Sequence, residues 1–124
     1  MLVYGPLAHG LLTGAIDEET TFEQSDWRSA SPLFEGDALR RNVQVVRRLE
    51  QLATALGASV SALAIAWTLV HLAVDVAIVG ARHAAHIEDS VGAAELRLGD
   101  AELAEIDAIM DGAVAVGGPS PESV

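Results

Sequence analysis

Two strand-like runs, separated by most of the chain, constrain the fold of this sequence more than any other feature. Leu2–Tyr4 ends in a Gly-Pro turn, and Asp75–Val79 is rich in β-branched residues, as expected of a parallel strand buried on both faces. Between them, apolar residues at 39–56 recur at steps of three and four and predict a helix, and Ser59 is a good N-cap for a second helix. This order predicts a right-handed parallel crossover.

The remaining segments complete an α/β pattern with few strands. Residues 7–34 have glycine breaks and no sustained period, which predicts a long loop. A third helix is expected over 84–94 and a fourth from Asp100, whereas the glycine- and proline-rich tail at 112–124 is expected to be flexible. Two parallel strands cannot bury both faces of a sheet, so we expect residues 1–111 to form a partial domain.

Composition narrows the possible partners. The 124 residues suffice for one domain, and the absence of cysteine, together with an N-terminus unlike a secretory signal, favours a cytoplasmic location. No apolar run reaches the roughly 18 residues needed to span a bilayer, so no membrane is expected as partner. The net charge of −11 disfavours a nucleic-acid partner, because such binding relies on cationic side chains that neutralise phosphates.

Few residues form a recognisable catalytic or metal-binding pattern. His83 and His86 have a spacing that suits metal ligands, but the sequence places no third ligand beside them, and we predict no metal site. His71, near a helix end, is interpreted as structural. The sequence contains no Walker pattern, no nucleophile elbow and no Gly-x-Gly-x-x-Gly after a strand.

The junction after the second strand favours phosphate binding. Gly80 lets a ligand approach the backbone closely, and the following helix offers unpaired N–H groups and a positive dipole end. Arg82 lies just ahead of that helix and could donate paired hydrogen bonds to a phosphate at the carboxyl end of the strand. The residues alone leave an alternative equally open, in which Arg82 caps the preceding structure or pairs with a surface acid.

Several ordered blocks of sequence resemble the aldo-keto reductases. The segment YGPLAHGLLTG at 4–14 is similar to the seventh strand, and the turn after it, of the family's (β/α)8 barrel. Further matches occur in the family's order at DWR (26–28), SPLF (31–34), ALAIAW (62–67), AIVGAR (77–82) and LAEID (103–107). The resemblance extends from Leu2 to about Ser120. It implies an α/β fold, the C-terminal part of a (β/α)8 TIM barrel, incomplete, with two parallel strands and flanking helices.

The resemblance also implies an NADPH-dependent oxidoreductase that converts aldehydes or ketones to alcohols. In the family pattern Tyr4 stacks on the nicotinamide ring, the turn at 7–10 follows the pyrophosphate, the loop to Phe34 covers the cofactor, and 80–82 hold the 2′-phosphate. Gly5 replaces a usual serine; near adenosine, His86 replaces Gln or Arg and Ser90 replaces Asn, which weakens the pattern there. The implied NADP(H)-binding residues are Tyr4, Gly5, Pro6, Leu7, Ala8, Gly10, Gly80, Ala81, Arg82, His86, Asp89 and Ser90.

The family's catalytic tyrosine, lysine, aspartate and histidine belong to the first half of the barrel. This chain has one tyrosine, Tyr4, and no lysine, so no catalytic residue is assigned to it. We expect it to be the C-terminal part of a reductase that acts on a small-molecule carbonyl substrate, inactive alone. The alternative is a non-enzymatic NADP(H)-binding or regulatory remnant completed by oligomerisation. Exposed strand edges also predict self-association, or a chain that is not stably folded by itself.

Overall fold

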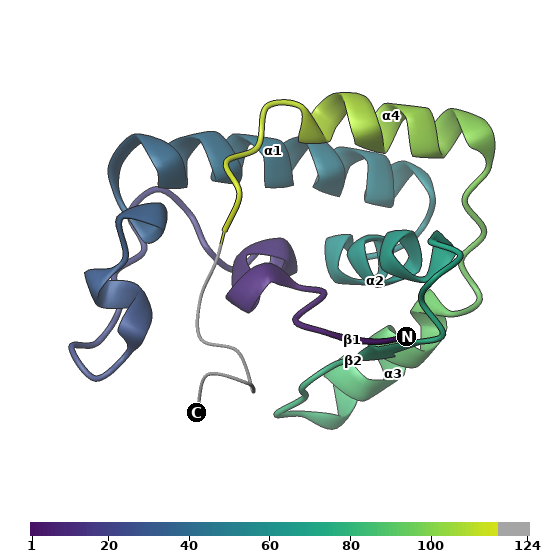
Figure 1. The fold of residues 1–124 in the computed structure, drawn as a ribbon, viewed down its shortest axis with the longest axis horizontal. Coiled ribbons are helices and arrows are strands. Elements are labelled where there is room, and N and C mark those ends of the chain that lie inside the picture. Colours follow the sequence, from purple (N-terminus) through teal and green to yellow (C-terminus); the bar gives the residue numbers. More distant parts are fainter. Residues whose placement is uncertain (117–124) are drawn as a thin grey trace.

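The computed structural model describes residues 1–116 and confirms the predicted pair of parallel strands. β1 (Leu2–Tyr4) pairs with β2 (Val76–Ile78), so that Leu2 lies opposite Val76 and Tyr4 opposite Ile78. Figure 1 shows the two strands side by side at one edge of a mostly helical body. The α/β fold with two parallel strands and flanking helices is therefore present.

The four predicted helices are also confirmed, with boundaries close to those expected. They are α1 (Gly36–Ala55), α2 (Val60–Val70), α3 (Ala84–Ala93) and α4 (Asp100–Met110). The Ser59 side chain caps α2 by accepting the N–H of Ala62 at 3.0 Å. Gly57, with a φ of 72°, occupies the left-handed position beyond the end of α1, which a residue with a side chain rarely adopts.

The main core lies where α1, α2 and α4 meet. Val43, Leu63 and Ile106 come from these three helices, and each is at most 2% exposed. A second, smaller cluster contains Ala62, Ile65 and Ala93, with Ala77 and Val79 packed against it. At this cluster α2 contacts both α3 and β2, so the inward face of the strands, with Val3 and Ala77, is half-buried.

One polar side chain inside the core holds the end of the described chain. Asn42, 2% exposed, accepts the N–H of Val114 at 2.8 Å and donates to its carbonyl at 3.0 Å. Ala113 and Val116 pack against the main core. The first part of the predicted flexible tail at 112–124 therefore contacts α1, and its residues 117–124 lie outside the described part of the chain.

The prediction that the second strand is buried on both faces is wrong. Val76 is 46% exposed and Ile78 is 50% exposed, whereas Ala77 faces the small cluster beneath α2. Leu2 and Tyr4, which pair with Val76 and Ile78, are exposed in the same way. The β-branched pattern suits a strand covered on both faces, and the described residues cover only one.

The long segment between β1 and α1 contains more structure than predicted. It forms short 3-10 segments at Ala8–Thr13, Trp27–Ala30 and Pro32–Phe34, and the first is interrupted by non-helical backbone at His9 and Gly10. Asp26 and Ser31 start the last two by accepting backbone N–H groups two residues further on. Such local side-chain bonds leave no periodic signal in a sequence, which explains why the segment resembled a plain loop.

Within residues 1–116, no single helix is both long enough and apolar enough to cross a membrane. The consecutive helices α1 and α2 satisfy that test of length and composition only when taken together, and they are bent by 89° at the break between them.

Candidate functional site

Both strands end at the same edge of the sheet, and the turn after β1 has an unusual backbone. Gly5 has a φ of 69° and Gly10 a φ of 95°, while Ala8 and His9 have φ values of 49° and 58°. Residues with a side chain adopt this left-handed region rarely, and such strain is concentrated at functional sites. The turn at 5–10 is therefore a candidate ligand-binding element at the carboxyl end of β1.

A cleft of about 400 Å³, here called the α3 cleft, joins this turn to the segment after β2. Leu7 contributes from the turn, and the other side is formed by the β2–α3 junction and by α3. Five of the residues implied by the family pattern meet here: Leu7, Gly80, His86, Asp89 and Ser90. The lining also includes five residues that sequence reasoning did not assign to a site: Thr13, Ala15, Ser59, Ser61 and Val79.

Hydrogen bonds already engage part of the α3 cleft. The Ser59 hydroxyl donates to one carboxylate oxygen of Asp89 at 2.6 Å, which ties α3 to the start of α2. The Ser90 hydroxyl donates to the backbone carbonyl of His86 at 2.8 Å. Ser90 therefore has only acceptor capacity for a ligand, whereas Asp89 keeps a second carboxylate oxygen and His86 an exposed imidazole.

A second cleft of about 810 Å³, here called the Arg82 cleft, lies on the other side of the turn. Arg82 and His9 line it together with loop residues Thr21, Phe22, Glu23, Ser25, Asp26, Trp27 and Arg28. Arg82 is exposed, and residues 1–116 provide it with no hydrogen bond or ion pair. Within this part of the chain the alternative in which Arg82 pairs with a surface acid is not observed, and the exposed guanidinium lines the cleft.

Arg28 organises the loop side of the Arg82 cleft, and the sequence pattern had given this residue no role. Its Nε and Nη2 donate to the Asp26 carboxylate, with a shortest distance of 2.6 Å, and its Nη1 donates to the His9 carbonyl at 2.8 Å. Hydrogen bonds from the side chain and then the backbone N–H of Arg28 lower the pKa of Asp26 to about 2. The same carboxylate raises the pKa of Arg28.

The other implied cofactor residues lie near the clefts without lining either one. These are Tyr4, Gly5, Pro6, Ala8, Gly10 and Ala81. The Tyr4 side chain is 44% exposed at the end of β1, so its ring is accessible for stacking. Ala8 packs its side chain against the main core, which leaves only its backbone for a ligand.

The histidines do not form a metal centre among residues 1–116. The rings of His83 and His86 are 5.2 Å apart, but no group of three or more potential metal ligands occurs in this part of the chain. His71 instead accepts the N–H of Ala73 through Nδ1 at 3.2 Å, which stabilises the turn after α2.

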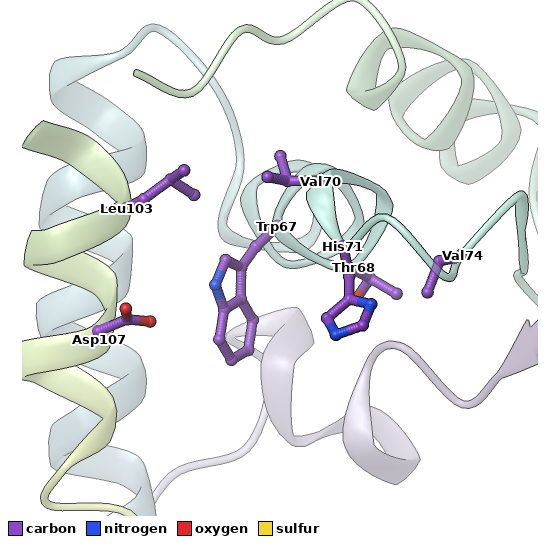
Figure 2. A pocket seen from close by; sticks show the side chains of 7 residues that line it. All are labelled: Trp67, Thr68, Val70, His71, Val74, Leu103 and Asp107. Carbon is purple, nitrogen blue, oxygen red and sulfur yellow. The ribbon is translucent and has the colours of Figure 1, made fainter. Parts of the chain in front are cut away.

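A third hollow, of about 500 Å³, lies between α2 and α4 and is shown in Figure 2. Trp67 and His71 face it from α2 and the turn beyond, and Asp107 faces it from α4 (Figure 2). Val74, which also lines it, comes just before β2, so this hollow opens near the amino ends of the strands. Ligands of parallel α/β folds bind at the carboxyl ends, which favours the α3 and Arg82 clefts.

Comparisons with known proteins agree with the sequence pattern. The family model described as Aldo/keto reductase family matches residues 1–111. Aldo-keto reductase yakc of Schizosaccharomyces pombe, whose name carries the designation NADP(+), is 30% identical over 98% of this chain and 36% of its own length. Aldo-keto reductase YhdN of Bacillus subtilis is 41% identical over 70% of this chain and 27% of its own length.

A solved structure gives the same result for the fold. The glycerol dehydrogenase AKR11B4 from Gluconobacter oxydans, a (β/α)8 barrel, matches 97% of this chain with a TM-score of 0.84 and 32% identity. The match covers 36% of that protein. The chain therefore has the fold of part of such a barrel and spans about a third of the length of the proteins it resembles.

Proposed function

Because the chain belongs to the aldo/keto reductase family, we propose that its α3 cleft and Arg82 cleft together form part of a binding site for NADP(H). The observation that carries this proposal is the parallel pairing of β1 with β2. It brings the turn at 5–10 beside the segment at 80–90, although most of the chain separates them. The name of the fission-yeast relative supports the choice of NADP(H) over NAD(H).

The residues present fit a dinucleotide that carries a 2′-phosphate. Arg82, which has no hydrogen bond or ion pair among residues 1–116, offers its guanidinium for that phosphate. A side chain added at Gly80 would meet no atom within 4 Å, so the backbone there is open to close approach. Tyr4 presents an accessible ring for the nicotinamide, and His86 with Asp89 provides polar atoms for adenosine.

The proposed role of this chain is to bind and orient the cofactor. NADPH bound there would supply a hydride to the carbonyl carbon of an aldehyde or ketone. A proton must also reach the carbonyl oxygen, and the chain has only one tyrosine, Tyr4, and no lysine for that task. We expect the chain alone to be inactive, with proton transfer dependent on residues outside this sequence.

Nucleotide titration tests the proposal. Arg82→Ala should weaken NADPH binding about tenfold or more, because a charged hydrogen bond contributes roughly 1.5–3 kcal/mol, and it should leave NADH binding nearly unchanged. Fluorescence titration of both nucleotides measures this difference, and Arg97→Ala, an exposed arginine in neither cleft, is the matched control. Equal losses for both nucleotides would show that Arg82 does not recognise the 2′-phosphate.

An assay of the purified chain tests the second part of the proposal. NADPH oxidation with a panel of aldehydes should stay at the background rate. Turnover well above background by the chain alone would contradict the assignment of proton transfer to residues outside it.

A second candidate function is a non-enzymatic NADP(H)-binding or regulatory remnant completed by assembly with a second copy. The exposed face of the sheet favours it, because Leu2, Tyr4, Val76 and Ile78 are between 44% and 66% exposed. Apolar side chains gathered on one open face promote association. Sedimentation over a concentration series should show oligomers, whereas a monomer at every concentration would contradict this candidate.

A further inference from the structure

Arg28 connects two segments that lie apart in the sequence, the loop at 22–28 and the turn after β1. Its guanidinium holds the Asp26 carboxylate on one side and the His9 carbonyl on the other. The side chains of Arg28 and Asp26 are 26% and 25% exposed. By contrast, the exposed pair Arg40 and Asp37 has exposures of 62% and 90% and joins only neighbouring turns of α1.

Aromatic side chains fix this connection to the core. The Arg28 guanidinium lies 4.3 Å from the centre of the Phe22 ring. Trp27 meets His9 edge to face at 4.9 Å and Phe34 at 5.7 Å, and Phe34 is only 3% exposed. The loop is therefore held by packing as well as by charge, so Arg28 has a defined position.

The turn that Arg28 contacts needs such support. His9 has a φ of 58°, a conformation that costs free energy in a residue with a side chain. Arg28 Nη1 bonds the carbonyl of this residue. A side chain added at Gly10 would come within 3.2 Å of Nη1, so glycine allows the guanidinium to approach the turn this closely.

We propose that Asp26 and Arg28 form a latch that fixes the left-handed turn at Ala8–His9 and so positions the turn's backbone for the pyrophosphate of NADP(H). Arg28 is a positioning residue in this scheme, whereas Arg82 contacts the nucleotide itself. The claim that the turn is positioned for the pyrophosphate rests on the proposed function. The claim that the latch fixes the turn rests on the contacts of Arg28 alone.

Hydrogen exchange of the nucleotide-free chain tests the hold on the turn. Arg28→Gln should speed exchange about tenfold or more in peptides that cover 8–13 and 22–30, because local opening then needs less free energy. Arg40→Gln, which breaks the exposed arginine–aspartate pair, is the matched control and should leave these peptides unchanged. Unchanged exchange in Arg28→Gln would overturn the latch.

Arg28→Lys keeps the positive charge but changes the geometry of the side chain. It also provides a second test if Arg28→Gln loses its helical circular dichroism and so fails to fold. One ammonium group cannot reproduce the planar fork that reaches both Asp26 and His9. We expect exchange in this variant to approach that of Arg28→Gln. Exchange equal to that of the wild-type chain would overturn the latch, because charge alone would then suffice.

Binding measurements with NADPH and with adenosine 2′-monophosphate distinguish a loss of positioning by Arg28 from a general loss of structure. Arg28→Gln should weaken NADPH binding about tenfold, yet leave adenosine 2′-monophosphate, which has no pyrophosphate, nearly unaffected. Arg82→Ala should weaken both. Equal losses of both ligands in Arg28→Gln would contradict the positioning role. If the wild-type chain bound no NADPH, the proposed function and the pyrophosphate role would fail together, and hydrogen exchange would still decide the hold on the turn.

Discussion

Helices α1, α2 and α4 bury the apolar side chains that form the main core, whereas β1 and β2 leave the apolar side chains of one face in solvent. Leu63 and Ile106 are each 1% exposed, but Leu2 is 66% exposed and Val76 is 46% exposed. The residue types on the two sides are alike, so the difference comes from the neighbours that each element meets. Burial is a property of the assembled structure, not of the residue type.

The two sides also differ in what they contain. The helical side holds the main core, in which the Asn42 hydrogen bonds also lie. The strand side carries the left-handed turn, the α3 cleft and the Arg82 cleft. Variants that affect one side and not the other therefore test this difference.

The largest effect is expected in the helical core. Leu63→Ala should lower the free energy of unfolding by about 2–5 kcal/mol, because it removes a buried side chain and leaves a cavity. Leu2→Ala makes the same chemical change on the exposed strand face and should stay within about 0.5 kcal/mol. Denaturant unfolding measures both, and similar losses would show that the strand face is buried in solution.

A smaller loss is expected at the polar contact between α1 and the end of the described chain. Asn42→Ala leaves the backbone N–H and carbonyl of Val114 without their partners, which should cost about 1–3 kcal/mol. Gln44→Ala, on the exposed face of the same helix, is the control and should change stability little. A loss equal to that of the control would mean that 112–116 does not rest against α1.

A still smaller loss of stability is expected at Ser59, which connects the start of α2 to α3. Ser59→Ala removes the N-cap of α2, which typically costs about 0.5–2 kcal/mol, and also frees the Asp89 carboxylate. We expect both reduced stability and faster hydrogen exchange in α3. Faster exchange in α2 alone would show that the Ser59–Asp89 bond does not hold α3.

The smallest effect concerns pH. Arg28 holds the pKa of Asp26 near 2, below its ordinary value of 3.8, so this pair contributes stability above pH 3.8 and loses it as the pH falls through about 2. Carbon-13 NMR of the carboxyl group should show a midpoint near 2. In Arg28→Gln the midpoint should return toward 3.8. A wild-type midpoint near 3.8 would mean that the ion pair is open in solution.

Sequence alone predicted the elements that carry a periodic or capping signal. The apolar spacing of α1 and the Ser59 cap of α2 depend on nearby residues, so they were predicted correctly. The exposure of Val76 was not predicted correctly, because it depends on which elements cover the sheet. The resemblance to the family implied that Leu7 and Gly80 belong to one cofactor site, and the structure brings both to the α3 cleft.

The latch shows why the rest of the site was not predicted. Arg28 bonds Asp26, two positions away, and His9, 19 positions away, and neither spacing repeats along the chain. The aromatic contacts of Trp27 and Phe22 follow no period either. Such contacts arise only when an irregular loop folds against a turn, so a one-dimensional pattern does not reveal them.

Backbone amide NMR during titration with NADP+ would show whether two segments far apart in the sequence form one nucleotide slot. We expect the amide signals of Leu7 and Gly10 to shift together with those of Gly80 and Ser90, all at one dissociation constant, while the signals of α4 stay unchanged. Saturable shifts confined to a single segment, or no saturable shift at all, would contradict it.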